Sequence, residues 1–255
     1  MSGKTHDFNS AYYESYESVT GLREKGDKPC LHAYWKRYLR RVKPEGKLLD
    51  VGCGLGFFLK CMQDIYDVCG IDVSEYAVRE ARKIAPNAQI EVGTATHLPF
   101  ERSSFDIVSA FDVVEHLEDP DLFFKESQRI LRQRGFLIFS TPNPDSLGAR
   151  LKEKDSNPEN LPYSHPLRKR VWHGWRDTSH IHIAPMAEWR RLLSSNGFAV
   201  VRDGTDFIWD VPYFRHIPSL IQWAPLVGLT CILVRLNGFY SWRFGENYTC
   251  VAKKV

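Results

Sequence analysis

The sequence predicts an α/β fold: a doubly wound, Rossmann-like sheet of seven strands with an antiparallel last strand, helices on both faces, and lid insertions. Two observations support this prediction. From Lys47 to Phe139, short apolar runs alternate with longer helical patterns, which is typical of parallel strands joined by crossover helices. The first apolar run ends in a glycine-rich turn, at the point where a sheet of this kind binds its ligand.

The first half of the chain accounts for five of the expected strands. Helical spacing between the apolar runs predicts the crossover helices. Ser74 is a good N-cap, and Pro120 suits a first helical position after Asp119. The expected strands are residues 47–51, 67–71, 89–92, 105–111 and 136–140, and the expected helices are residues 55–65, 75–84 and 120–131.

After Ser140 the alternation stops. Residues 141–183 are rich in Pro, Asn, Ser, His and Trp without a clear period, and a loop that long inside a compact domain is usually functional. A helix at 186–195 then leads into a sixth strand at 198–202. A second irregular, aromatic insertion separates this strand from the last one, residues 247–253, which is consistent with an antiparallel final hairpin.

Composition limits the function. The formal net charge of +3 is small, and no N-P-P-[YF] motif follows the fourth strand, so we expect no nucleic acid partner. None of the six cysteines forms a C-x-x-C pair, which disfavours a zinc knuckle. The opening MSGKTHDFNS lacks the apolar region of a signal peptide, so we expect a cytoplasmic protein. Residues 217–234 are strongly apolar but marginal for a bilayer span, so peripheral membrane contact through them stays an open alternative.

The segment LLDVGCGLGFFL predicts a site for a nucleoside cofactor. Gly52, Gly54 and Gly56 allow unusual backbone angles and close approach by a ligand at the end of the first strand. Asp72, at the end of the second strand, is placed to accept hydrogen bonds from a ribose diol. The spacing G-x-G-x-G disfavours a dinucleotide, and so does Asp50, because its carboxylate would repel a pyrophosphate. A nucleoside with a sulfonium and an amino-acid tip meets these requirements.

Four motifs, taken together and in order, resemble those of the class I S-adenosylmethionine-dependent methyltransferases: LLDVGCGLGFFL, GIDVS, GTATHLPFERSSFDIVSAFDVVEHLEDP and RILRQRGFLIFSTPNP. The likeness is to the small-molecule branch that includes the ubiquinone-biosynthesis O-methyltransferases, and it covers roughly Tyr34 to Phe198 plus the final strand. It implies S-adenosylmethionine as the cofactor. It also implies a set of cofactor-binding residues: Asp50, Gly52, Cys53, Gly54 and Gly56 in the loop, Asp72 and Val73 at the ribose and adenine, Ala95 and Thr96 along the adenine edge, and Phe111 and Asp112 near the methyl group.

The candidate catalytic residues follow the fourth strand, in FDVVEHLEDP. Asp112, Glu115 and His116 have the spacing D-x-x-E-H, and a helical turn would place them on one face. Downstream, DTSHIHIAP adds His180 at the active-site end of the predicted sheet. We expect His116 and His180 to be catalytic or orienting, because an oxygen acceptor usually needs a base to expose its lone pair. A purely structural role for both stays an open alternative.

A metal is the other alternative at these residues. The pattern resembles the E-x-x-E-H and distal His set of some metal-dependent O-methyltransferases, with Asp in place of the first Glu. Carboxylates and imidazoles together suit Mg²⁺, Mn²⁺ or Zn²⁺. The candidate metal ligands are Asp112, Glu115, His116 and His180.

We predict a single methyltransferase domain over residues 1–255. Its expected parts are an N-terminal helical cap (1–44), a cofactor-binding core (45–140), acceptor-side insertions (141–185 and 205–244), and a closing helix and strands (186–204 and 245–255). Aromatic residues in the cap and insertions favour a small-molecule acceptor that is apolar or ring-shaped, and Arg168–Arg170 could hold an anionic group on it. These aromatic residues are Tyr12, Tyr13, Tyr16, Trp172, Trp175, Trp209, Tyr213, Phe214 and Trp223.

Three functions compete. The leading hypothesis is a methyltransferase that uses S-adenosylmethionine to methylate an oxygen of a quinone, lipid-linked, polyketide or sugar-type acceptor. The second is an oxidoreductase that uses a nicotinamide dinucleotide on the same sheet, which the glycine spacing disfavours. The third is a non-catalytic S-adenosylmethionine-binding protein, which an intact loop does not exclude. The fold alone decides none of them.

Overall fold

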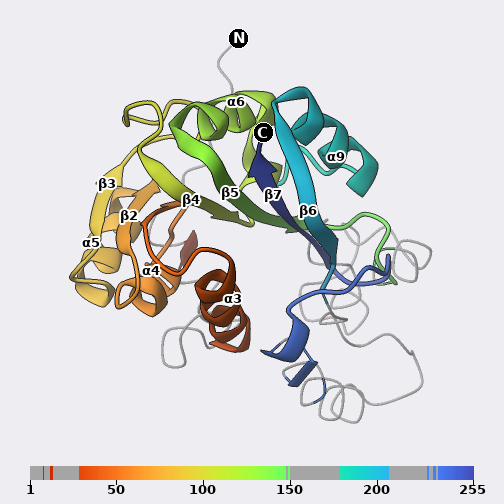
Figure 1. Cartoon of the computed structure of the whole chain (residues 1–255), viewed down its shortest axis with the longest axis horizontal. Helices are drawn as coiled ribbons and strands as arrows, with labels where there is room; N and C mark the ends of the chain where they lie inside the picture. Colours follow the sequence, from red (N-terminus) through yellow and green to blue (C-terminus); the bar gives the residue numbers. More distant parts are fainter. Residues whose placement is uncertain are drawn as a thin grey trace, which may run out of the picture.

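In the computed structural model, the described part of the chain forms one sheet of seven strands in the order β3-β2-β1-β4-β5-β7-β6 (Figure 1). The structure describes residues 8, 12–13, 29–147, 149, 179–206, 229, 232–233 and 235–255. Neighbouring strands from β3 to β5 pair in parallel, whereas β7 pairs antiparallel with both β5 and β6. The predicted fold class is therefore confirmed, including the antiparallel last strand. The strands are β1 Lys47–Val51, β2 Asp67–Asp72, β3 Gln89–Val92, β4 Phe105–Phe111, β5 Leu131–Pro142, β6 Phe198–Thr205 and β7 Asn247–Lys254.

Helices cover both faces of this sheet (Figure 1). Aromatic and aliphatic side chains of α6 and α9 join the buried cluster on one face, and those of α3, α4 and α5 join the cluster on the other. Burying one large apolar side chain is worth about 1.5–3 kcal/mol, so these two clusters hold the layers together. The helices are α3 Pro29–Val42, α4 Phe57–Met62, α5 Glu75–Ile84, α6 Pro120–Ile130 and α9 Met186–Ser195, and a short 3₁₀ turn, η1, covers Val114–His116.

The predicted helix starts are confirmed at α5 and α6. The side chain of Ser74 accepts a hydrogen bond from Ala77 N at 3.2 Å, and the side chain of Asp119 accepts one from Asp121 N at 3.0 Å. Each cap satisfies a backbone N–H group that has no partner within its helix. Pro120 occupies the first turn of α6, where its missing N–H costs nothing.

Three predicted boundaries are wrong. Strand β5 begins at Leu131, directly after α6, rather than at residue 136. Its first residues are irregular: the pairing with β4 shifts register between Phe105 and Ile107, and Arg134 has a left-handed φ of 64°. Strand β6 runs on to Thr205 rather than ending at residue 202. Helix α4 spans Phe57–Met62 rather than residues 55–65, and it begins late because Gly56 before it has a φ of 82°.

Part of the predicted organisation lies outside the described residues. This holds for Tyr16, for Arg168–Arg170, for the six aromatic residues named in the two insertions and for most of residues 217–234. The division of the domain into cap, core and insertions therefore stays a prediction, although α3 lies within the expected cap. No helix among the described residues has both the length and the apolar character needed to cross a membrane.

Candidate active site

The carboxyl ends of β1, β2 and β4 meet at one edge of the sheet, and the loop after β1 lies there against β2. The amides of Gly52 and Cys53 both donate to the carbonyl oxygen of Ile71, at 2.7 and 3.1 Å. Gly52 has a φ of 68°, and a Cβ at this position would lie 2.4 Å from Val113 Cγ2. Glycine is therefore required both by the left-handed backbone and by the close approach of Val113. This contact brings the loop after β1 next to the residues that follow β4.

Asp72 is buried at the end of β2 and accepts two backbone hydrogen bonds. Its Oδ2 accepts from Gly54 N at 2.8 Å, and its Oδ1 accepts from Ser74 N at 2.9 Å. Burial raises the pKa of Asp72, and these backbone donors oppose that rise because they favour the charged form. The carboxylate thus ties the glycine loop to the start of α5, and its unused lone pairs can accept from the hydroxyl groups of a ligand.

The hydroxyl of Tyr13 already makes such a contact, since it hydrogen-bonds to Asp72. Burial and the nearby carboxylate raise the pKa of Tyr13 well above its ordinary value, so the phenol stays protonated and donates. A Cβ added at Gly54 would meet one neighbouring atom within 4 Å, Tyr13 Cε1 at 3.9 Å. The side of Asp72 and Gly54 where a ribose is expected is therefore covered by an aromatic ring from the N-terminal segment.

Asp50 lies below the loop, near the end of β1. It is buried, and its Oδ1 accepts a hydrogen bond from Ser109 Oγ on β4 at 2.7 Å. Sequence reasoning missed Ser109, although a polar residue inside the apolar run IVSAF was a usable signal. The contact orients the Asp50 carboxylate across two neighbouring strands.

The other predicted cofactor residues lie in four places: the loop after β1, the end of β2, a turn after β3 and the end of β4. Cys53 is buried, and burial raises the pKa of its thiol well above the ordinary value. Val73 is half exposed after β2, while Ala95 is buried and Thr96 half-buried in a turn closed by the bridge between Thr94 and His97. Phe111 packs edge-on against Phe58, with ring centroids 4.9 Å apart. The structure places these residues, and their roles toward a cofactor stay predictions.

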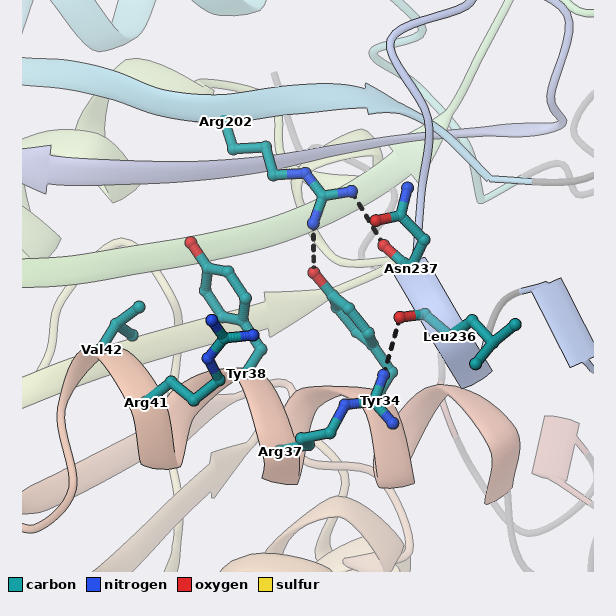
Figure 2. Close-up of a pocket in the computed structure, with 8 residues that line it drawn as sticks. All are labelled: Tyr34, Arg37, Tyr38, Arg41, Val42, Arg202, Leu236 and Asn237. Atoms are coloured by element: carbon teal, nitrogen blue, oxygen red, sulfur yellow. Dashed lines mark hydrogen bonds between the residues drawn. The ribbon is translucent and has the colours of Figure 1, made fainter.

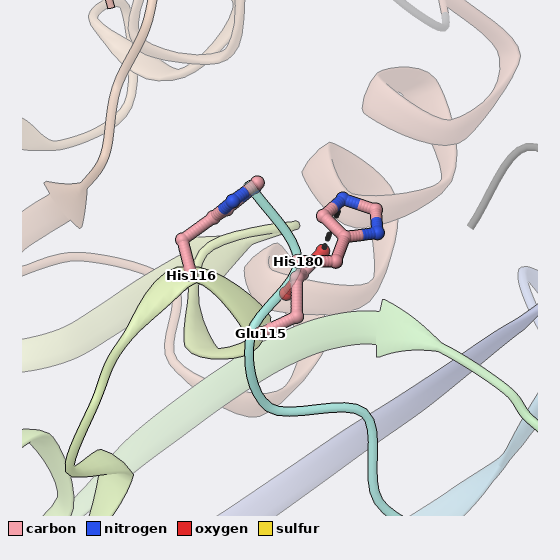
Figure 3. A group of neighbouring side chains, drawn as sticks. All are labelled: Glu115, His116 and His180. Carbon is pink, nitrogen blue, oxygen red and sulfur yellow. Dashed lines mark ion pairs between the residues drawn. The ribbon is translucent and has the colours of Figure 1, made fainter. Parts of the chain in front are cut away.

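Glu115, His116 and His180 come together beside this edge (Figure 3). One potential ligand atom from each residue lies within 4.8 Å of the others. The Glu115 carboxylate is fully buried and forms an ion pair of 4.0 Å with His180 Nε2, and the two imidazole rings have centroids 4.7 Å apart. The backbone explains this juxtaposition, because the amides of Ile181 and His182 both donate to the carbonyl oxygen of Glu115 at 2.9 Å.

Asp112 does not join this cluster, in contrast to the predicted four-residue metal set. The prediction assumed a helical turn, but the segment turns as a short 3₁₀ helix, and Asp112 before it has a left-handed φ of 56°. Its Oδ1 instead accepts a hydrogen bond from Ser140 Oγ on β5 at 2.8 Å. The backbone conformation therefore directs Asp112 toward β5.

Ser179 is a second residue that sequence reasoning missed. Its carbonyl oxygen lies 3.1 Å and its Oγ 2.9 Å from His116 Nδ1. Because a carbonyl can only accept, this contact favours the tautomer with the proton on Nδ1 of His116, in which Nε2 is the acceptor nitrogen of the neutral ring. The arrangement thus prepares His116 Nε2 to accept a proton.

Aromatic rings connect the two parts of the site. Phe8 packs edge-on against His116, with centroids 5.5 Å apart, and against Tyr12, at 5.0 Å. Tyr12 in turn packs against Tyr13 at 5.3 Å, and Tyr13 reaches Asp72. Tyr12 and Tyr13 were expected at this end of the sheet, whereas Phe8 was not singled out. Together these rings link the imidazole of His116 to the carboxylate of Asp72.

Comparisons with known proteins agree with this geometry. Residues 49–139 match the family model of the methyltransferase domain. The chain is 35% identical over 135 residues to a probable S-adenosylmethionine-dependent methyltransferase of Mycobacterium tuberculosis, an overlap of 49% of this chain and 48% of the relative. It is 32% identical over 101 residues to the ubiquinone biosynthesis O-methyltransferase of Pelagibacter ubique, covering 38% of this chain and 42% of that protein. The chain thus spans less than half the length of each of these two curated relatives.

A solved structure gives the same result for the fold. An S-adenosylmethionine-dependent methyltransferase from Thermotoga maritima matches with a TM-score of 0.61 at 20% identity, over 96% of this chain and 96% of that one. At this level of identity the match establishes the fold and nothing finer.

Proposed function

The chain carries a methyltransferase domain of the class I S-adenosylmethionine-dependent family, and from this premise we propose that it transfers a methyl group to an oxygen atom of a small, largely apolar or ring-shaped acceptor. The observation that carries the proposal is the position of His116, whose Nδ1 is held by Ser179 while Glu115 and His180 flank it. An acceptor hydroxyl needs a proton acceptor as its oxygen attacks, and His116 Nε2 is the group we assign to it.

S-adenosylmethionine fits the residues at the strand ends. Asp72 already accepts a hydrogen bond from the hydroxyl of Tyr13, so a ribose hydroxyl can take the same position once the tyrosine ring moves aside. Gly54 offers space there, because its nearest neighbour is that same ring. The bound cofactor supplies an activated methyl group, and the chain's own contribution is to hold donor and acceptor in line.

A divalent metal is the alternative within this proposal, because an imidazole nitrogen that holds an ion cannot also take the acceptor's proton. Glu115, His116 and His180 offer one carboxylate and two imidazoles within reach of one ion, a donor set that suits Mg²⁺, Mn²⁺ or Zn²⁺. When bound, such an ion would lower the pKa of an acceptor hydroxyl. Without it, the ion pair between Glu115 and His180 positions the second imidazole beside His116.

The acceptor class rests on the aromatic residues and on a relative. Phe8 and Tyr12 place aromatic rings between Asp72 and His116, which suits a ring-shaped or prenylated acceptor. The Pelagibacter relative is named for ubiquinone biosynthesis. We therefore place quinols and related phenols first among candidate acceptors, ahead of lipid-linked, polyketide and sugar-type molecules.

The test separates binding from chemistry. In His116→Gln we expect the rate of methyl transfer to a quinol to fall by roughly 10²–10⁴ while S-adenosylhomocysteine binds within about threefold of the wild type. His182→Gln is the matched control, because His182 lies in the same segment but packs against Trp189 outside the cluster. Equal rates in His116→Gln and the wild type would refute His116 as the base. Binding of NAD instead of S-adenosylhomocysteine would refute the cofactor.

The metal is tested on the same enzyme. Chelation should lower the rate, and added Mg²⁺, Mn²⁺ or Zn²⁺ should restore it, if the ion takes part. A rate unchanged by a chelator would leave His116 acting alone. Binding of S-adenosylhomocysteine without turnover of any acceptor would favour the non-catalytic alternative.

A further inference from the structure

A pocket of about 350 Å³ lies between helix α3 and strand β6 (Figure 2). Three arginines line it: Arg37 and Arg41 from α3, and Arg202 from β6. The other lining residues are Tyr34, Tyr38, Val42, Leu236 and Asn237, and none of the eight is acidic. A pocket of this size holds a small ligand, and its charge favours an anion.

Two of the three arginines, Arg37 and Arg202, are held in place by neutral partners. Arg202 donates to the hydroxyl of Tyr34 at 2.6 Å and to the carbonyl oxygen of Asn237 at 2.8 Å. Arg37 donates to the carbonyl oxygens of Arg235 and Leu236. Within the described part of the chain, Arg41 has no hydrogen-bond or ion-pair partner. These contacts orient the guanidinium groups without cancelling their charge.

The tyrosines do not cancel it either. Burial raises the pKa of Tyr34 to about 12, with Arg202 opposing the rise, and burial also raises the pKa of Tyr38. Both hydroxyls are therefore protonated at neutral pH, and the pocket keeps its full positive charge. Lys36 of α3 differs from these arginines, because it forms an ion pair of 2.7 Å with Asp64.

Exposed apolar side chains continue from the pocket. Leu236 lines the pocket and is 65% exposed, and Ile232 and Leu229 are 59% and 51% exposed. Each of these three residues has a helical backbone, and the spacing of three and four residues between them is typical of neighbours on one helical face. Val42, at the other end of the pocket, is also exposed. A water-soluble anion in the pocket would leave these aliphatic side chains exposed, whereas a lipid surface would bury them.

We propose that this pocket binds the phosphodiester headgroup of an anionic membrane lipid, while Leu229, Ile232 and Leu236 enter the adjoining apolar part of the bilayer surface. Arg37, Arg41 and Arg202 supply the charge that selects an anionic headgroup, and the three aliphatic side chains select a lipid over a free phosphate ester. The proposal goes beyond methyl transfer and is independent of it, since it concerns attachment of the protein to a surface.

The experiment is co-sedimentation of the full chain with vesicles, without cofactor or acceptor. Vesicles of phosphatidylcholine mixed with phosphatidylglycerol should bind the wild type and release it as salt rises, and vesicles of phosphatidylcholine alone should not. In Arg37→Gln/Arg41→Gln we expect the partition coefficient to fall by roughly tenfold or more, and in Leu229→Ser/Ile232→Ser by a similar factor. Circular dichroism reports that each variant is folded, without reference to the proposed cofactor.

The matched control is Lys60→Gln/Lys83→Gln, which removes the same net charge from exposed positions on α4 and α5. This control should bind vesicles like the wild type. An equal loss of vesicle binding in the control would mean that net charge alone causes the effect, and it would overturn the proposal. Saturable binding of inorganic phosphate in the pocket without vesicle binding would assign the site to a soluble anion and would also overturn it.

Discussion

At the scale of single residues, Asp72 combines two opposing requirements. Its burial raises its pKa and disfavours the carboxylate, whereas the amides of Gly54 and Ser74 stabilise that same carboxylate. A solvated ribose acceptor would avoid the burial, but it would hold its hydrogen bonds less firmly because water would compete for them. The burial of Asp72 therefore costs some folding free energy, which we attribute to its proposed role in ligand binding.

The first prediction concerns the substitution Asp72→Asn. The variant keeps the shape of the side chain but loses the charge and one acceptor atom, and charge-assisted hydrogen bonds contribute about 1.5–3 kcal/mol each. We expect the affinity for S-adenosylhomocysteine, measured by calorimetric titration, to fall by roughly 10- to 100-fold. Asp64→Asn is the matched control: Asp64 is an exposed aspartate paired with Lys36, and its substitution should leave the affinity unchanged. An unchanged affinity in Asp72→Asn would mean that the ribose does not bind there.

The second prediction is a pH dependence of the same affinity. Because the pKa of Asp72 is raised in the free protein, acidification protonates it at a pH above the ordinary value of about 3.9. A protonated carboxyl accepts fewer hydrogen bonds, so the affinity for S-adenosylhomocysteine should fall as the pH falls through this raised pKa.

The raised pKa of Asp72 affects folding stability in the opposite direction: acidification should favour the folded state. A carboxyl whose pKa is raised on folding contributes stability below its unfolded pKa and loses that contribution as the pH rises through the folded pKa.

The control for the affinity prediction is the same pH titration of Asp72→Asn, whose affinity for S-adenosylhomocysteine should not fall on acidification. A step of equal size in this variant would assign the titration to another group.

Single residues also show how far the sequence could predict the site. Gly52 and Asp72 were predictable because a short local pattern places them at two strand ends. Ser179 was not, because it meets His116 across 63 residues of chain and carries no motif of its own. Asp112 was misplaced because its left-handed φ is not encoded in a pattern that assumes a helix.

At the scale of elements, the end of β6 depends on two close backbone contacts. Gly204 pairs with Thr249 of β7 and lies against the segment after Asn237: a Cβ at Gly204 would lie 1.9 Å from the carbonyl oxygen of Tyr240. Next to it, Thr205 N donates to that same oxygen at 2.8 Å. The absence of a side chain at Gly204 therefore lets the 240–245 segment attach to the sheet edge.

The third prediction follows from this contact. Gly204→Ala cannot be relieved by a rotamer change, because the obstructing atom belongs to the backbone, so we expect a loss of about 2 kcal/mol or more in the free energy of unfolding. Chemical denaturation followed by circular dichroism measures it. Val201→Ala, at an exposed position on the same strand, is the matched control and should change the free energy by less than about 1 kcal/mol. Equal stability of both variants would mean that the segment can detach without cost.

Element boundaries were predictable where local signals dominate. The bounds of β1, β4 and α9 follow from apolar periodicity and from flanking breakers, and they match the structure to the residue. The ends of β5 and β6 depend instead on partners distant in the chain. At β6, the polar Asp203 and Gly204 read as a loop, although Asp203 accepts hydrogen bonds from Arg190 and Tyr248 and stays in the strand.

At the scale of the whole molecule, segments that are far apart in the sequence meet at the carboxyl ends of β1, β2 and β4. The glycine loop contacts Val113 after β4, Asp72 anchors the start of α5, and rings from the N-terminal segment cross from Asp72 to His116. A ligand that binds these groups therefore contacts parts of the chain far apart in sequence. Its binding free energy should act on the cooperative unfolding of the domain as a whole.

The fourth prediction uses this linkage. A ligand that binds only the folded state stabilises it by about 2.7 kcal/mol at a concentration of 100 times its dissociation constant, and for a domain of this size each kcal/mol raises the melting temperature by roughly 2–4 °C. S-adenosylhomocysteine at that concentration should therefore raise the Tm by roughly 5–10 °C in a thermal shift assay, and NAD should not. The Asp72→Asn variant at the same ligand concentration should show a shift of roughly half that size or less, because the concentration is then only about 1 to 10 times its dissociation constant. A Tm shift with NAD but not with S-adenosylhomocysteine would place the protein among the dinucleotide-binding proteins, because the stabilisation identifies the nucleoside that binds at the strand ends.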